Sequence, residues 1–175
     1  MNFPLYFLAA LWLCPFFLQA QDSPASKLKQ LGITLPEVSA PMANYVKYVQ
    51  TGNLVFLAGH GHCGEPVEGD RGKLGKDLTI EQGYQAARRV GICLLASLND
   101  AVGGDLSRVK RIVKVTGMVN SADDFYDQPK VVNGCSDLMV EVFGEKGKHA
   151  RAAVGMASLP SNLTVEIEMI VEVEE

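Results

Sequence analysis

The stretch HARAAVGMASLPSNLTVEIE, residues 149–168, contains two strand-like segments on either side of a Leu-Pro turn. Small apolar residues surround Arg151 in the first segment, and valine, isoleucine and methionine alternate with glutamate in the second as far as residue 173. A guanidinium stays charged and is costly to bury alone, so Arg151 needs water, a carboxylate or a ligand. The stretch therefore predicts two closing strands and marks Arg151 as a candidate functional residue.

The second segment has one apolar and one acidic face. Period two puts the glutamates together on the face opposite Val165, Ile167, Met169, Val171 and Val173, namely Glu166, Glu168, Glu172 and Glu174. If this strand paired with the strand that carries Arg151, a carboxylate would lie near the guanidinium. The pattern leaves a structural ion pair and a small-ligand site equally open.

A β-hairpin and a long helix are expected earlier in the chain. Residues 44–50 and 53–60 are rich in β-branched and aromatic residues and flank a Thr-Gly turn. Thr79 and Gln82 form a capping-box pattern, which predicts a helix from Ile80 that ends before a pair of glycines.

A third strand and a second helix complete the expected order. Residues 108–121 alternate Lys or Arg with Val and Ile, which predicts a strand with one solvated face, and a helix is expected from about Pro129 to Gly144. The order ββαβαββ predicts an α+β fold, a mixed sheet with two helices on one face. The other face would need cover, so we expect an oligomer.

The composition is that of one globular domain. The chain has 175 residues, 47% of them hydrophobic and 21% charged, and a formal net charge of −4. The sequence pI is about 5.4 and no basic run occurs, so the electrostatic pattern of a nucleic-acid partner is absent from the sequence.

The N-terminus resembles a secretory signal. Residues 1–20 contain no charged side chain and end in Leu-Gln-Ala, which favours cleavage after Ala20. The apolar run would also just span a bilayer, but two prolines in it favour cleavage. We expect an exported protein, periplasmic or secreted, with a leader of little regular structure at 21–41 and a domain at 42–175. No membrane contact is expected after cleavage.

Two clusters of reactive residues leave alternatives open. After cleavage three cysteines are left, so at most one bridge forms, and either Cys93 pairs with Cys135 or both are small buried residues. In GHGHCGE, residues 59–65, metal-capable side chains lie close together: His60, His62, Cys63 and Glu65. No second ligand pair is visible, so a polar turn at the rim of a cleft is favoured and no metal is assigned.

The C-terminal stretch resembles the C-terminal signature of the YjgF/RidA family, also known as endoribonuclease L-PSP-like. Its motifs have the spacing found there, and further matches extend the likeness over about residues 42–174: Arg151, Leu159-Pro160, Val165 to Glu168, Tyr45-Val46, Gly52-Asn53 and Asp124-Phe125. The resemblance implies a chorismate-mutase-like fold. It also implies a homotrimer with ligand sites in the clefts between subunits.

The resemblance further implies hydrolytic deamination of small 2-imino or enamino acids to 2-keto acids and ammonia, without metal or organic cofactor. Arg151 would clamp the substrate carboxylate, and Glu166 would orient or activate the attacking water. Tyr45 would line the cleft from a neighbouring subunit, and the Gly59 backbone would help to hold the ligand. His149 stands where the family commonly has a proline or another small residue, on the strand face of Arg151, and could narrow the pocket.

Two other functions are open. Imino acids made by pyridoxal-phosphate enzymes arise in the cytoplasm, so an exported chain could instead be a non-catalytic trimeric binding protein for small carboxylates. An endoribonuclease is disfavoured, because the acidic chain offers no basic groove and its three histidines show no recognisable acid/base pair.

Overall fold

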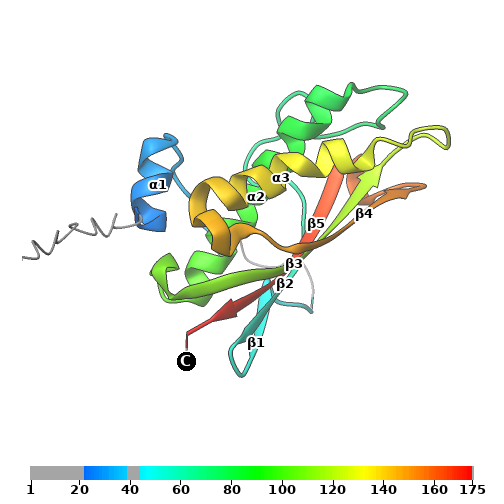
Figure 1. The fold of residues 1–175 in the computed structure, drawn as a ribbon. Helices are drawn as coiled ribbons and strands as arrows, with labels where there is room; N and C mark the ends of the chain where they lie inside the picture. The colour runs from blue at the N-terminus through cyan, green and yellow to red at the C-terminus, as the bar shows by residue number, and fades with distance from the viewer. Residues whose placement is uncertain (1–21, 39–43, 175) are drawn as a thin grey trace, which may run out of the picture.

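The structure is a computed structural model that describes residues 22–38 and 44–174, and the expected signal segment lies outside these residues. Five strands form one sheet in the order β1-β2-β5-β3-β4 (Figure 1). The strands are β1 Tyr48–Thr51, β2 Leu54–His60, β3 Val109–Asn120, β4 Ala150–Met156 and β5 Val165–Val173. Only the β3–β4 pair is parallel, so the sheet is mixed as predicted.

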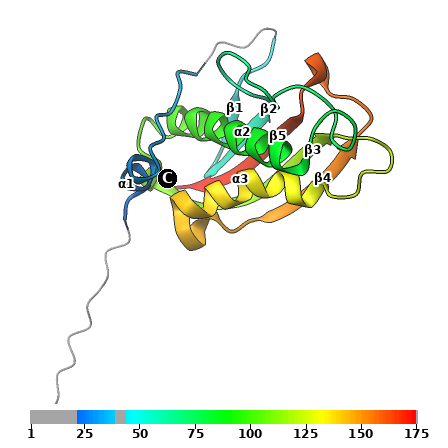
Figure 2. The same ribbon diagram turned by 90° about the horizontal axis from the view of Figure 1, so that it is seen from above.

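Two helices, α2 (Ile80–Ala101) and α3 (Gln128–Phe143), lie side by side on one face of the sheet (Figure 2). Both hydrogen bonds of the capping box form at Thr79, so α2 begins where the sequence predicts. A Cβ built on Gly134 of α3 would overlap the Tyr84 carbonyl of α2, so this glycine allows the two helix backbones to approach closely. The predicted order ββαβαββ is confirmed.

A short helix, α1 (Pro24–Gln30), precedes this unit in the segment expected to have little regular structure. That expectation is wrong for residues 24–30, because the Ser23 hydroxyl caps the helix, Pro24 starts it, and Leu28 packs into the core. Three short 3₁₀ turns complete the structure: η1 Leu106–Arg108, η2 Gly144–Gly147 and η3 Pro160–Asn162. None of the described helices is long and apolar enough to cross a membrane.

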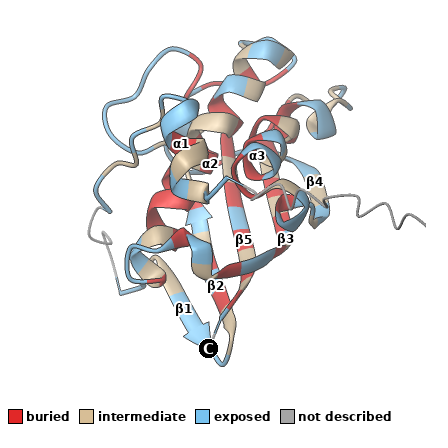
Figure 3. Cartoon of the chain, turned by 60° about the vertical axis from the view of Figure 1, so that its left-hand side comes forward, coloured by how far each residue is buried: buried red, intermediate tan, exposed pale blue. Residues whose placement is uncertain are grey.

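The two faces of the sheet differ in their surroundings. Buried residues alternate with less buried ones along β5 (Figure 3), and the buried set packs beneath α2 and α3. The opposite face, called here the open face, carries apolar side chains from all five strands of this sheet: Val49, Phe56, Met118, Val154 and Ile170. Val49, Phe56 and Val154 are exposed.

Candidate functional site

Arg151 and Glu166 lie on different strands and on opposite faces of the sheet. Arg151 of β4 is aligned with Val115 of β3, which is fully buried beneath the helices, whereas Glu166 of β5 is aligned with Met118 on the open face. The suggestion that the glutamate strand pairs with the arginine strand is therefore wrong. β5 has the larger apolar side chains and takes an interior position, and β4, with small residues, takes the edge.

The Arg151 side chain is held from one side by helix α3. Its Nη1 donates to Asn133 Oδ1 at 2.7 Å and to Ser136 Oγ at 3.0 Å. Neither Nε nor Nη2 forms a hydrogen bond or ion pair with the residues that the structure describes. The Nε and Nη2 donors form a planar fork that suits a carboxylate. Within the described chain, this arrangement favours the ligand alternative over a structural ion pair.

His149 supports the same network, on the side of the sheet that the sequence predicted. Its Nδ1 lies 2.7 Å from the Gly147 carbonyl oxygen and its Nε2 lies 3.1 Å from Ser136 Oγ. A carbonyl only accepts, so Nδ1 carries the hydrogen and Nε2 accepts from the Ser136 hydroxyl. Burial lowers the pKa of His149, and the nearby Arg151 charge acts in the same direction. A neutral His149 therefore holds Ser136, which in turn holds Arg151.

Glu166 lies in a cleft of about 490 Å³ that Tyr45 and Gly59 also line. A Cβ built on Gly59 would overlap the Glu166 carboxylate oxygen, so the carboxylate rests directly on the Gly59 backbone. Three of the predicted site residues therefore line one cleft within a single chain: Tyr45, Gly59 and Glu166. Arg151 and His149 lie outside this cleft. The cleft wall contains residues that the sequence analysis did not assign to it, namely Lys47, Arg71, Ala96 and Ser97.

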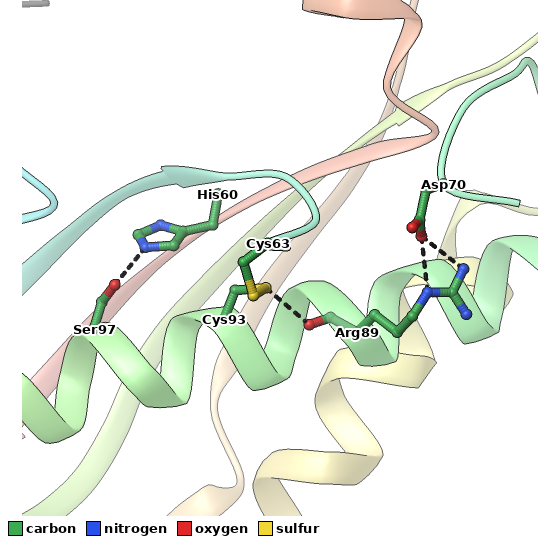
Figure 4. Close-up of a disulfide and its surroundings, with 6 residues drawn as sticks. All are labelled: His60, Cys63, Asp70, Arg89, Cys93 and Ser97. Atoms are coloured by element: carbon green, nitrogen blue, oxygen red, sulfur yellow. Dashed lines mark hydrogen bonds and ion pairs between the residues drawn. A yellow bond between two sulfur atoms is a disulfide. The ribbon is translucent and has the colours of Figure 1, made fainter. Parts of the chain in front are cut away.

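A disulfide joins the cleft wall to helix α2 (Figure 4). It links Cys63 to Cys93, with 5.9 Å between the Cα atoms, so the suggested Cys93–Cys135 bridge is wrong. Cys135 is free and buried, and burial raises its pKa to about 12. Spacing along the chain gave no signal for this pairing, because the loop that brings Cys63 to the helix has no regular pattern.

The Cys63 loop is also held by an ion pair between a buried aspartate and a partly exposed arginine. Asp70 is only 4% exposed, and its Oδ1 lies 2.7 Å from Arg89 Nη2 and 2.8 Å from Arg89 Nε (Figure 4). Its Oδ2 accepts from the Val67 backbone N–H at 2.8 Å. The sequence analysis missed this pair, because nineteen positions separate its members and the intervening loop sets their approach.

The histidine and cysteine cluster is not arranged as a metal site. Cys63 is oxidised, and both ring nitrogens of His60 are bonded to protein atoms. No group of three or more metal-capable side chains occurs among residues 22–38 and 44–174. The polar-turn interpretation fits this part of the chain, since His60, His62 and Cys63 all line the cleft.

Residues 25–173 match the model of a family described as "YjgF/chorismate mutase-like, putative endoribonuclease". The chain belongs to this family. The match covers the sheet, helices α2 and α3 and most of α1, and it includes Arg151 and Glu166. The expected fold class and the expected family are therefore both confirmed.

Several relatives of this YjgF-family chain align along most of their length. Protein TCP17 of Trypanosoma cruzi is 43% identical over 154 residues, covering 87% of this chain and 96% of that protein. A 2-iminobutanoate/2-iminopropanoate deaminase of Dermatophagoides farinae is 30% identical over 143 residues, covering 81% and 95%. The crystal structure of Atu1372 from Agrobacterium tumefaciens, a protein of unknown function, has a TM-score of 0.79 and 40% identity, covering 87% and 92%. The relatives of this chain thus include an imine deaminase.

Proposed function

We propose that this protein hydrolyses small 2-imino and enamino acids to 2-keto acids and ammonia, at a site shared between subunits of a homotrimer. The observation that carries the proposal is the placement of two groups. Arg151 presents a free guanidinium edge on one face of the sheet, and Glu166 presents a carboxylate in a cleft on the other. The deaminase among its relatives supports the same chemistry.

The separation of these groups supports a shared site. One whole strand, β3, lies between them, and their register partners, Val115 and Met118, are three residues apart. Adjacent strands lie about 4.8 Å apart and each residue rises about 3.3 Å, so the two Cα atoms are on the order of 14 Å apart. A small imino acid cannot bridge that distance across a sheet. Arg151 of one subunit would therefore meet Glu166 of another.

The open face supports the association that such a site requires. Val49, Phe56 and Val154 leave apolar surface exposed there, and both long helices lie on the opposite face. Burying this surface against copies of the same chain would contribute roughly 25 cal/mol per Å² of apolar area. Closed cyclic symmetry would use the same residues in every subunit.

The chemistry follows from the roles of the two residues. The Arg151 fork binds the substrate carboxylate and orients the imine carbon. Glu166 accepts a proton from water as the water oxygen bonds to that carbon, and the C=N electron pair moves to nitrogen. The protonated Glu166 gives its proton to the nitrogen, which yields a tetrahedral amino alcohol. Glu166 then takes the hydroxyl proton and passes it to the nitrogen as the C–N bond breaks, so ammonia leaves and the carbonyl of the 2-keto acid forms without a redox partner.

Export remains part of the proposal. The Cys63–Cys93 disulfide supports it, because such bonds persist in oxidising compartments. The substrate would then be an imino acid formed outside the cytoplasm, for example by oxidation of an amino acid there.

The deciding experiment measures ammonia release from 2-imino acids generated freshly by an amino acid oxidase. The chain from residue 21 is compared with Arg151→Ala and Glu166→Gln, against the uncatalysed rate. We expect Glu166→Gln to lower kcat by about 10²- to 10⁴-fold while it still binds an inert carboxylate. Arg151→Ala should lose that binding, and Arg151→Lys should restore little of it, since an ammonium lacks the fork.

Two matched variants control for charge removal. Arg111→Ala removes an exposed arginine of β3, and Glu174→Gln removes an exposed glutamate beyond β5; both should retain wild-type turnover. A folded wild-type protein that releases no ammonia above background but binds carboxylates through Arg151 would replace the deaminase by a binding protein. A monomer with full activity in sedimentation and kinetic measurements would overturn the shared site.

A further inference from the structure

Strand β2 contains an extra residue at the point where it meets Glu166. Leu57 is aligned with Met169 and His60 with Ile167, so β2 advances three residues while β5 advances two. Ala58 and Gly59 therefore form a β-bulge. Bulges change the direction of nearby side chains and are frequent beside functional sites.

The bulge sets the position of the Glu166 carboxylate. Gly59 has no side chain, and the carboxylate oxygen occupies the space that a Cβ would take. A small displacement of the Gly59 backbone would therefore displace the carboxylate. In a site where Glu166 directs water, such displacements are costly, since an error of about 1 Å can lower a rate about 100-fold.

His60 fixes the bulge by a hydrogen bond that spans Gly59. Its Nδ1 lies 2.6 Å from the Ala58 carbonyl oxygen. Its Nε2 lies 2.8 Å from Ser97 Oγ on α2 (Figure 4). A carbonyl only accepts, so Nδ1 carries the hydrogen and Nε2 accepts from the serine hydroxyl. The imidazole thus connects the bulge to a helix that the Cys63–Cys93 disulfide and the Asp70–Arg89 pair also hold.

The burial of this pair sets it apart from ordinary surface hydrogen bonds. His60 is 6% exposed and Ser97 is 2% exposed, yet both border the cleft that contains Glu166. An apolar side chain would fill the same space without the cost of burying three polar groups. Burial lowers the pKa of His60, so the ring stays neutral and keeps the tautomer that the Ala58 carbonyl requires.

We propose that His60 and Ser97 are positioning residues for Glu166, which act by holding the Ala58–Gly59 bulge beneath its carboxylate. The inference rests on the proposed deaminase function for its kinetic consequence. Its structural part, that His60 holds the bulge, stands on the two hydrogen bonds of the His60 ring and on the register of β2 with β5.

Four variants test the proposal. His60→Leu removes the donor and keeps apolar volume, and we expect kcat to fall roughly 10- to 100-fold with KM little changed. His60→Asn places an amide nitrogen close to the position of Nδ1 and should restore most of kcat. Ser97→Ala keeps the helix and removes the donor to Nε2, so its effect should be intermediate. His149→Leu, the matched control, removes the same contacts beside Arg151 and should raise KM instead.

Hydrogen exchange provides a readout that does not need turnover. The backbone amides of residues 58–60 should exchange faster in His60→Leu than in wild type or His60→Asn. Unchanged exchange in folded His60→Leu would overturn the proposal, and so would unchanged kcat, or a His60→Asn variant as slow as His60→Leu. If wild type shows no turnover, the deaminase function fails, and the exchange comparison still decides whether His60 holds the bulge.

Discussion

Two histidine–serine pairs in this protein have the same hydrogen bonds and different surroundings. His60 bonds the carbonyl two residues before it and Ser97 of α2, and His149 bonds the carbonyl two residues before it and Ser136 of α3. The first pair is buried beneath a cleft and holds a strand bulge. The second is partly exposed and holds the side chain of Arg151. The same local contacts therefore hold the backbone of a strand beside the cleft and the side chain of Arg151 beside the edge strand β4.

The surroundings of the two histidine–serine pairs also differ in their cysteines. Beside the cleft, Cys93 lies one helical turn before Ser97 on α2 and is bonded to Cys63. Near the edge strand β4, Cys135 adjoins Ser136 on α3 and is a free, buried thiol. The difference teaches that the irregular loop at the cleft is tied to α2 by a covalent bond, whereas α3 is held against α2 by close packing at Gly134 and by the Arg88–Glu141 ion pair. Four predictions test or sharpen this contrast.

The largest effect is expected from the disulfide. Cys63 and Cys93 are separated by 30 positions, and closing a loop of that length stabilises the folded chain by about 2–4 kcal/mol. Cys63→Ser should lower the free energy of unfolding in urea by about this amount, and a reducing agent should do the same to wild type. A reductant should then have little further effect on Cys63→Ser. Equal losses of unfolding free energy in Cys63→Ser and Cys135→Ser would contradict the contrast between the bonded and the free cysteine.

The next effect is on catalysis. Gly59→Ala puts a methyl group where the Glu166 carboxylate lies, and the flexible carboxylate moves aside at little cost in stability. Turnover should fall about 100-fold, equivalent to about 2.7 kcal/mol, with unfolding nearly unchanged. Gly155→Ala on β4 is the matched control, since its Cβ also meets side-chain atoms, those of Gln128 and Ser121. Comparable turnover in the two variants would show that the Gly59 contact does not matter.

A smaller effect is expected at Arg151. Asn133→Ala removes the acceptor that lies 2.7 Å from Nη1 and leaves Ser136 in place. The guanidinium is exposed, so we expect KM to rise only about three- to tenfold, with kcat unchanged. Steady-state kinetics would separate the two constants. A fall in kcat alone would place Asn133 in the chemical step and not in carboxylate binding.

The smallest effect concerns pH. Burial lowers the pKa of both histidines, with Lys47 adding to this at His60 and Arg151 at His149. Below about pH 6.5 the unfolded histidines gain protons that the folded ones resist, so stability falls as the pH drops from there through the lower folded pKa values. His60→Asn and His149→Asn should each flatten the dependence of unfolding free energy on pH between 7.5 and 5. If neither variant changes that slope, the histidines do not titrate in this way.

Much of the fold could be predicted because its signals are local. Three signals depend only on neighbours within a few residues: the capping box at Thr79, the alternation of β5, and the strand patterns of the last two strands. α1 was missed because its stability depends on Leu28 reaching the core, which no local pattern reports. The grouping of Glu166 and Gly59 came from the family resemblance, and the structure brings those two residues together.

The sequence by itself determined the order of the five strands and two long helices, the family, and the two residues proposed for the chemistry, since each depends on residue type and spacing along one segment. Only the tertiary structure decided that β3 separates Arg151 from Glu166 and that Cys63 pairs with Cys93. It also decided that the hydrogen bond from His60 to the Ala58 carbonyl spans Gly59. These relations depend on strand order and on the path of an irregular loop. Both are set by how the whole apolar surface is buried, and no short stretch of sequence contains that information.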